Sequence, residues 1–305
     1  MNSFGEKWTF TSFGESHGAA IGGVLDGVPA GVHIDFAMIR EELKRRREGV
    51  KELRSEGVST RALREPDEIE WLSGVMDGVT LGTPIAFIIR NKDARPEDYE
   101  WLKIHYRVGH ADKVYELKYG IRDWRGGGRA SARETAARVV AGCIAKQELE
   151  AKGIRIHADL IQVGAETDPA QFAQTIANYQ KEGDSIGGII ECRIQGLPVG
   201  TGEPIFDKLQ AHLAFAVMSI NACKGFEYGT GFEGVAQPGS AINAISGGIA
   251  GGISDGTEVV FRCVFKPTPS TPKAGVKGRH DACVAVRAVP VVEAMSALAI
   301  INLLK

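Results

Sequence analysis

The spacing of apolar residues along the chain predicts several amphipathic helices. Between residues 136 and 144, apolar side chains recur at the three- and four-residue spacing of one helix face, and Gly153 is a typical helix end. Ser131 and Glu134, which precede this run, are typical of an N-terminal capping box. Further helices are predicted at residues 35–47, 168–183, 206–220 and 291–304.

Short runs rich in β-branched and aromatic residues lie between these helices and predict strands. They cover residues 85–89, 160–163, 189–194 and 258–265. The connections are rich in glycine and irregular, and the sequence contains no clear linker, low-complexity tract or tandem repeat. The pattern therefore predicts one mixed α/β domain over residues 1–305.

Residues 229–234 match the GxGxxG pattern of dinucleotide-binding proteins. That fingerprint requires a strand before the glycines and a helix directly after them. Here Val-Ala-Gln-Pro-Gly-Ser follows, which does not favour a helix. We interpret these glycines as a turn, and an NAD-dependent oxidoreductase remains an alternative that rests on this segment alone.

The composition is that of a globular protein, with 44% hydrophobic residues, 24% charged residues and a net charge of −2. Such a balance gives no reason to expect nucleic acid or an anionic membrane surface as a partner. Basic residues are nevertheless clustered at positions 40–47 and 122–133. A local positive potential in a nearly neutral protein favours a small anionic ligand.

The five cysteines are widely spaced and include no CxxC pair, which argues against a disulfide framework and against a zinc or other metal site. The N-terminal residues are polar and do not resemble a signal peptide. We also find no apolar run of the roughly 20 residues that a membrane span needs. The sequence thus predicts a cytoplasmic protein without a membrane partner.

A glycine-rich turn with three arginines, at residues 125–134, directly precedes the helix predicted after Ser131. The first turn of a helix has free N–H groups and the positive end of the helix dipole. Glycines let a ligand approach the backbone, and arginines add paired donors. This segment favours a phosphate site, although an ordinary capped helix after a surface loop is the alternative.

Two histidines lie beside glycines in short segments. His17 lies within Gly-Glu-Ser-His-Gly, and His110 follows Gly109 in a segment that also contains Arg107 and Asp112. Asp112 either fixes the tautomer of His110 or is a solvated charge. Exposed loop histidines without a function are the alternative for both residues.

In their order along the chain, these segments resemble the chorismate synthase family. The resemblance covers nearly the whole chain and rests on six groups of residues. They are TSFGESHG at 11–18 with DGVP at 26–29, RGGGRASARET at 125–135, SINA at 219–222, GGIAGGIS at 247–254, FKPTPS at 265–270, and GRHD at 278–281 with RAVPVVEA at 287–294.

The resemblance implies a lyase of the shikimate pathway. The family converts 5-enolpyruvylshikimate 3-phosphate to chorismate and phosphate by a 1,4-elimination, and it requires reduced FMN (FMNH2). It also implies an α+β fold in which helices lie between antiparallel sheets, and a homotetramer. Since the chain has no convincing nicotinamide site, we expect a separate source of reduced flavin, although NADPH-dependent reduction by the chain itself stays open.

The resemblance also implies roles for individual residues. His17 would protonate or hydrogen-bond the leaving phosphate, His110 would act on the reduced flavin near N1, and Asp281 would help to remove the proton. Four arginines are candidates for the substrate anions: Arg40, Arg46, Arg107 and Arg133. The residues expected to hold FMN are Arg129, Ala130, Ser131, Asn221, Ala222, Gly251, Lys266, Pro267, Thr268, Pro269, Ser270 and Arg279.

The chain also departs from the family pattern. Val108 stands where the family usually has proline, Glu48 replaces a proline, and residues 50–62 lack the usual threonine-rich pattern. The stretches after Asn243 and Ser270 are shorter than the family's loops. Since both flank the expected flavin site, a non-catalytic protein that binds flavin or a phosphorylated ligand is the alternative function.

Overall fold

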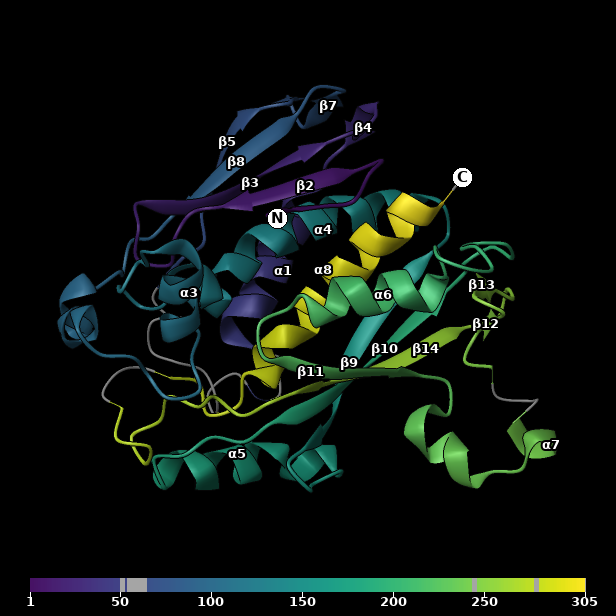
Figure 1. Cartoon of the computed structure of the whole chain (residues 1–305). Helices are drawn as coiled ribbons and strands as arrows, with labels where there is room; N and C mark the ends of the chain where they lie inside the picture. Colours follow the sequence, from purple (N-terminus) through teal and green to yellow (C-terminus); the bar gives the residue numbers. More distant parts are fainter. Residues whose placement is uncertain (50–52, 54–64, 243–245, 277–279, 305) are drawn as a thin grey trace.

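Two antiparallel sheets lie on either side of a layer of helices (Figure 1). The computed structural model describes residues 1–49, 53, 65–242, 246–276 and 280–304. Within those residues the strand pairs are antiparallel. The α+β class and the β-α-β sandwich implied by the family resemblance are therefore confirmed. The alternating helices and strands do not build a parallel sheet.

The first sheet has the strand order β1-β2-β3-β8-β5. In β8, Ile85, Phe87 and Ile89 are fully buried while their neighbours alternate outward, as the two-residue period of a strand requires. The strands are β1 Ser3–Phe4, β2 Thr9–Phe13, β3 Ala20–Asp26, β5 Ile69–Ser73 and β8 Ile85–Arg90.

The second sheet has the strand order β11-β14-β10-β9. Its alternate residues also point into the core, for example Phe261 and Phe265 of β14, both at most 1% exposed. The strands are β9 Arg155–Val163, β10 Gly188–Gln195, β11 Cys223–Tyr228 and β14 Val259–Phe265.

Four helices fill the space between the two sheets (Figure 1). Helices α4 and α8 approach closely because Gly142 has no side chain: a Cβ at that position would lie 2.4 Å from the Cβ of Ala294. The four are α1 Phe36–Glu48, α4 Thr135–Ala151, α6 Leu209–Met218 and α8 Ala285–Leu303.

A network of four charged side chains links three of these helices inside the core. Glu293 of α8, only 1% exposed, accepts from Lys146 of α4 at 2.6 Å and from Arg45 of α1 at 2.9 Å. Glu42 of α1 accepts from the same two cations at 3.1 and 2.8 Å. Burial alone would raise the pKa of Glu293, but Arg45 and Lys146 hold it below its usual range.

The remaining elements lie around the sandwich, with α5 outside the second sheet (Figure 1). The short strands are β4 Ala30–His33, β6 Val75–Met76, β7 Val79–Leu81, β12 Ile249–Ala250 and β13 Ile253–Ser254. The helices are α3 Asp112–Tyr119, α5 Phe172–Lys181 and α7 Gly239–Ile242, and the 3-10 turns are η2 Pro96–Lys103, η3 Gly128–Ala130, η4 Ala132–Glu134, η5 Pro169–Gln171 and η6 Gly231–Ala236.

The helices predicted from the sequence are confirmed, with shifted ends. Asp35 caps α1 by accepting from two backbone N–H groups. Ser131 caps η4, the turn that leads into α4, as the predicted capping box requires. The carboxylate of Glu134, the other member of that box, instead accepts from Arg138 at 3.0 Å. The four predicted strands are present, and residues 229–234 form a turn and a 3-10 helix rather than a dinucleotide motif.

Helix α8 begins at Ala285, six residues before its predicted start at 291. By length and composition it is apolar enough to cross a membrane, but 83% of its most apolar window is buried inside the fold. Its apolar character is thus accounted for by its place between the sheets, where it packs against α4, α6 and α1. It is the C-terminal helix that the sequence predicted at 291–304.

Candidate active site

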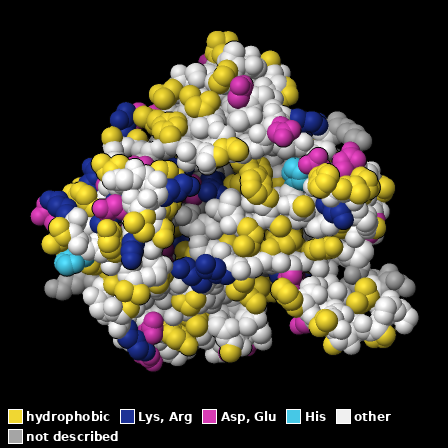
Figure 2. Space-filling model, in the orientation of Figure 1, with side chains coloured by type: hydrophobic (Ala, Val, Ile, Leu, Met, Phe, Trp, Pro, Cys, Tyr) yellow, Lys and Arg dark blue, Asp and Glu magenta, His cyan; other side chains and the backbone are white. Residues whose placement is uncertain are grey.

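A cavity of about 510 Å³ lies where the glycine-rich turn before α4 meets three other loops. These loops follow β2, precede α3 and follow β14. The turn before α8 completes the wall with Asp281 and Val284. In Figure 2, Lys and Arg side chains border a recess between α3 and α6. Segments far apart in the sequence thus build one chamber.

The cavity wall carries more positive than negative charge. Its acidic side chains are Glu65, Asp67 and Asp281. Its cations are Arg46, Arg47, Arg107, Arg133, Lys224, Lys266 and Arg287. The excess of positive charge favours a ligand with several negative groups, because low-dielectric walls strengthen the attraction.

Two consecutive glycines bring two histidines to the cavity. A Cβ at Gly126 would lie 2.1 Å from Cε1 and Nδ1 of His17, and one at Gly127 would lie 2.6 Å from Cε1 of His110. Both glycines have positive φ, +60° and +90°. Their turn therefore requires glycine for its backbone conformation and also for the space that the imidazoles occupy.

His17 is held from two sides. It is 4% exposed, its Nδ1 lies 3.0 Å from Oγ of Ser16, and the ring of Tyr99 meets its imidazole edge-on with centroids 4.8 Å apart. The hydroxyl engages Nδ1 and fixes the orientation of the imidazole, which lies in the cavity wall. A buried, oriented imidazole of this kind can exchange a proton with a bound group.

His110 is oriented by Asp112, so the first of the two sequence interpretations of Asp112 holds. Nδ1 of His110 lies 2.8 Å from Oδ1 of Asp112, which also accepts from Arg107 at 2.8 Å. We assign the Nδ1 proton to this contact because the carboxylate only accepts. Burial would raise the pKa of Asp112, but hydrogen bonds from Arg107 and His110 lower it well below its usual range.

Two buried arginines share one carboxylate beside the cavity. Nη1 of Arg46 lies 3.4 Å from Oδ2 of Asp67, and Nη1 of Arg133 donates to Oδ1 of the same residue. Arg46 also donates to Thr135 and to the carbonyl of Ala132, at 3.0 and 2.8 Å. Burial, reinforced by the charge of nearby arginines, lowers the pKa of Arg46 to about 9.

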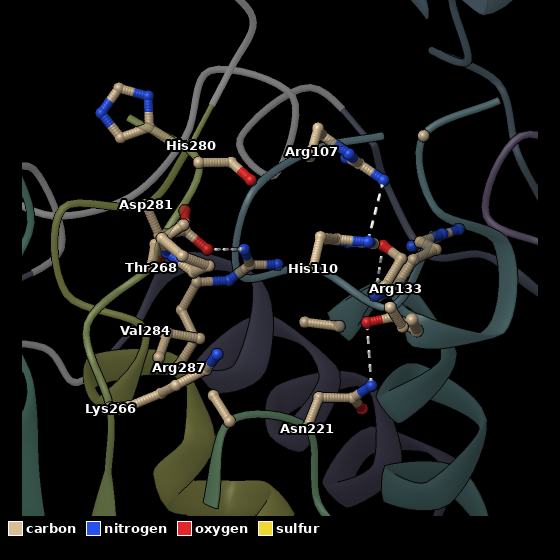
Figure 3. A pocket seen from close by; sticks show the side chains of 18 of the residues that line it. Arg107, His110, Arg133, Asn221, Lys266, Thr268, His280, Asp281, Val284 and Arg287 are labelled. Carbon is tan, nitrogen blue, oxygen red and sulfur yellow. Dashed lines mark hydrogen bonds and ion pairs between the residues drawn. The ribbon is translucent and has the colours of Figure 1, made fainter. Parts of the chain in front are cut away.

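Asp281 faces the cavity from the turn before α8, where Arg287 holds its carboxylate (Figure 3). Nη1 of Arg287 donates to Oδ2 of Asp281 at 2.6 Å, and its Nε donates to the carbonyl of Arg46 at 3.0 Å. The two bonds fix the acid relative to the end of α1.

The segment after β14 and residues 221–222 form the wall expected to hold a flavin. The backbone of Lys266 donates to the carbonyl of Ala222 at 3.0 Å, and Nδ2 of Asn221 donates to the carbonyl of Ala130. Among the described residues, Oδ1 of Asn221 and Oγ of Ser270 are buried without a hydrogen-bond partner. Buried orphan groups need a partner, so this wall suits a ligand rich in polar atoms, such as a flavin.

Most of the predicted site residues line this one cavity. They are His17, His110, Asp281, Arg46, Arg107, Arg133, Ala130, Ser131, Asn221, Ala222, Lys266, Pro267, Thr268, Pro269 and Ser270. The structure thus brings the two histidines and Ser131 together from three separate motifs.

Three predicted residues within the described part of the chain are not among those that line it. Arg129 donates to Ser12 and to the carbonyl of Gly14, so its guanidinium is engaged with β2 and the loop that follows. Arg40 is exposed on α1 beside a separate surface hollow. Gly251 lies in the turn between β12 and β13, and Arg279 lies outside the described residues.

Sequence reasoning did not single out several residues of the wall. Arg287 lies in the quoted RAVPVVEA segment, so its motif was a usable signal. Tyr99 and Asp67 belong to no motif, and only the fold places them beside His17 and Arg133. Side chains of that kind are recognisable from contacts alone.

Comparisons with known proteins agree on one family. A family model described as chorismate synthase matches residues 8–304. A chorismate synthase of Christiangramia forsetii is 46% identical, with 97% of this chain and 95% of the relative covered. One of Phocaeicola vulgatus is 44% identical, with 99% and 97% covered.

Comparison with solved structures indicates the same family. A solved structure described as a chorismate synthase superimposes with a TM-score of 0.79 at 29% identity, covering 98% of this chain and 92% of the other. The alignments to the two relatives run over 345 and 355 positions, more than the 305 residues of this chain. These relatives therefore carry internal residues without a counterpart here. In sequence and in fold, the chain belongs to the chorismate synthase family.

Proposed function

We propose that the cavity is the active site in which this chain converts 5-enolpyruvylshikimate 3-phosphate to chorismate and phosphate with reduced FMN. The conversion is the reaction of its family, and the family requires a reduced flavin. The observation that carries the location is the convergence of His17, His110 and Asp281 on one cationic cavity of about 510 Å³.

The charge of the cavity suits this substrate. 5-Enolpyruvylshikimate 3-phosphate carries a phosphate and two carboxylates, so its binding site needs several cations at fixed positions. Arg46, Arg107 and Arg133 are the proposed substrate residues on the wall, and each is already oriented by a carboxylate, Asp67 or Asp112. Preset guanidinium groups lose little rotational freedom when the anion binds. Arg40, which lies at a separate surface hollow, remains a proposed substrate-binding residue.

The flavin would lie against residues 266–270 and Asn221, where the orphan polar atoms are found. Ala130 and Ser131 would contact it through the backbone and the hydroxyl. When bound, reduced FMN supplies an electron-rich ring that can ease departure of the phosphate. Proposals for the same group also include Arg129, Gly251 and Arg279.

The protein side chains would move the protons. The substrate loses a proton from carbon and a phosphate from the other end of the allylic system. His17, with Nδ1 on Ser16, would give a proton or hydrogen bond from Nε2 to the leaving phosphate. Asp281, paired with Arg287, fits a charged carboxylate that assists removal of the carbon-bound proton. His110 would bond the reduced flavin near N1.

The setting of the enzyme is a further part of the proposal. Helices α4 and α8 contact the second sheet and α4 also contacts the first, which supports treating residues 1–305 as one domain. The five cysteines are free and buried, as suits a reducing cytoplasm. We expect a homotetramer, a small-molecule substrate without nucleic acid or membrane partners, and a separate source of reduced flavin.

An anaerobic assay with purified chain, reduced FMN and 5-enolpyruvylshikimate 3-phosphate tests the function. We expect chorismate and phosphate in equal amounts, with an absorbance change of the flavin on substrate addition. A chain that binds both ligands and forms neither product is instead the non-catalytic binding protein. His17→Ala and His110→Ala separate these outcomes, because only an enzyme has a rate to lose.

A further inference from the structure

Asp67 is buried between two arginines of the cavity wall. Its side chain is 0% exposed, and those of Arg46 and Arg133 are 3% and 6% exposed. Each of its two oxygens takes the Nη1 group of a different arginine. One carboxylate therefore joins a side chain from α1 to one from the turn before α4.

The rest of each guanidinium is also held. Nε of Arg46 donates to Thr135 at 3.0 Å, and Nε of Arg133 donates to Oδ1 of Asn91 at 2.9 Å. The two arginines repel each other, and Asp67 is the shared counter-charge that offsets this repulsion. Burial would raise the pKa of Asp67, but Arg133 and Arg46 lower it, so the carboxylate is charged at neutral pH.

The backbone at this position is unusual too. Asp67 has a φ of +53°, in the left-handed region that non-glycine residues seldom adopt. Asparagine and aspartate tolerate that region better than other side chains. The conformation directs the side chain into the interior from the segment that leads into β5.

We propose that Asp67 is a positioning residue, which holds Arg46 and Arg133 side by side as one preformed site for the anionic substrate. The inference rests on the proposed function, since it assigns these arginines to the substrate. Asp67 is a fully buried member of the same wall. It adds negative charge to the site, yet it strengthens anion binding because it fixes the two guanidinium groups.

Asp67→Asn tests this directly, because two views of the site predict opposite changes in the affinity for the substrate. Asparagine keeps the shape and suits the left-handed backbone, but it removes the charge. If net charge alone governed binding, the variant would bind the substrate more tightly. The positioning role instead predicts at least about tenfold weaker binding of 5-enolpyruvylshikimate 3-phosphate by calorimetry, the size expected when coupled charges in one network are separated.

The matched control lies one residue along the chain. Glu68 pairs with Lys92 at the surface and is 67% exposed, so Glu68→Gln makes the same chemical change outside the cavity and should leave binding unchanged. Flavin binding should be unchanged in both variants, and KM should rise more than kcat falls in Asp67→Asn. Equal or tighter substrate binding by Asp67→Asn overturns the proposal.

A second pair of variants covers the case in which Asp67→Asn does not fold. Arg46→Lys and Arg133→Lys keep the charge but lose the fork that reaches Asp67 and a second partner. We expect each to weaken substrate binding, and unchanged binding by both contradicts the role. If wild-type protein makes no chorismate, the proposed function fails, while binding of the substrate and of inorganic phosphate still decides the role of Asp67.

Discussion

Gly126 lies directly against the imidazole of His17, so close that a Cβ would be 2.1 Å from two ring atoms. The neighbouring Gly127 has the same relationship to His110. The glycine-rich segment, which was predicted from the sequence to be a phosphate site, thus has a second role. It provides the surface on which both histidines are packed, and this links the motif at 125–135 to the chemistry of the cavity.

Gly126→Ala should therefore abolish most of the activity. The new methyl group must displace His17, whose place between Ser16 and Tyr99 leaves little freedom. Loss of a positioned acid or base lowers kcat by about 10²-fold or more. Steady-state rates of chorismate formation measure this effect.

Gly31→Ala is the control for backbone strain. Gly31 also has a positive φ, +86°, but a Cβ there meets nothing within 4 Å. This variant should lose some stability and keep its kcat. Comparable loss of kcat in both variants would mean that backbone strain, rather than contact with His17, explains the result.

Asp112→Asn should lower kcat by about 10²-fold. The amide keeps one acceptor oxygen only. It cannot accept from His110 and Arg107 at Oδ1 and also from Nε and the backbone N–H of Arg107 at Oδ2, as the carboxylate does. The control is Asp159→Asn, which alters an exposed aspartate 3.2 Å from His157 that is not among the residues lining the cavity. Unchanged kcat in Asp112→Asn would show that the orientation of His110 has no part in turnover.

Arg287→Lys should reduce turnover more than tenfold while flavin binding persists. Lysine carries the charge but cannot bond Asp281 and the carbonyl of Arg46 at the same time. Arg193→Lys, in a surface cluster with Glu191 and Glu258, is the matched control. Activity equal to wild type would separate Arg287 from the reaction.

Glu293→Gln should destabilise the fold at neutral pH by about 3–5 kcal/mol, because it leaves buried cations short of a counter-charge. The folded-state pKa of Glu293 is below its ordinary value of 4.5. Its contribution is therefore complete above pH 4.5 and is lost as the pH falls through the folded-state pKa.

Denaturant unfolding at several pH values measures this contribution. The gap in unfolding free energy between wild type and Glu293→Gln should be widest near pH 7 and should narrow in acid. Glu70→Gln, at an exposed pair with Arg90, should differ from wild type by a much smaller unfolding free energy at every pH. A gap that is the same at every pH would exclude a charged Glu293 as its cause.

The sequence predicted the parts of the fold that local pattern controls. Helix α1 has its cap at Asp35, and α4 follows Ser131, because capping and periodicity depend on neighbours in the chain. The order in which the strands pair side by side cannot be predicted from local pattern in this way. That β14 lies between β11 and β10 depends on contacts between distant segments, so the local pattern did not predict it, and the family resemblance implied only that the sheets are antiparallel.

The candidate site divides in the same way. His17, His110 and Asp281 lie in recognisable motifs, and the structure brings them to one cavity. Asp67 and Tyr99 act through contacts with residues far along the chain, so no local signal marks them. Gly251 shows the reverse: its motif is clear, yet it lies away from the cavity residues, and its role stays a prediction.

A crystal structure of the chain with FMN and 5-enolpyruvylshikimate 3-phosphate tests the location of the active site most directly. We predict the flavin against residues 266–270 and Ser131, and the substrate phosphate within hydrogen-bond distance of Nε2 of His17. Flavin or substrate bound outside this cavity, with His17 and His110 touching neither, would contradict it.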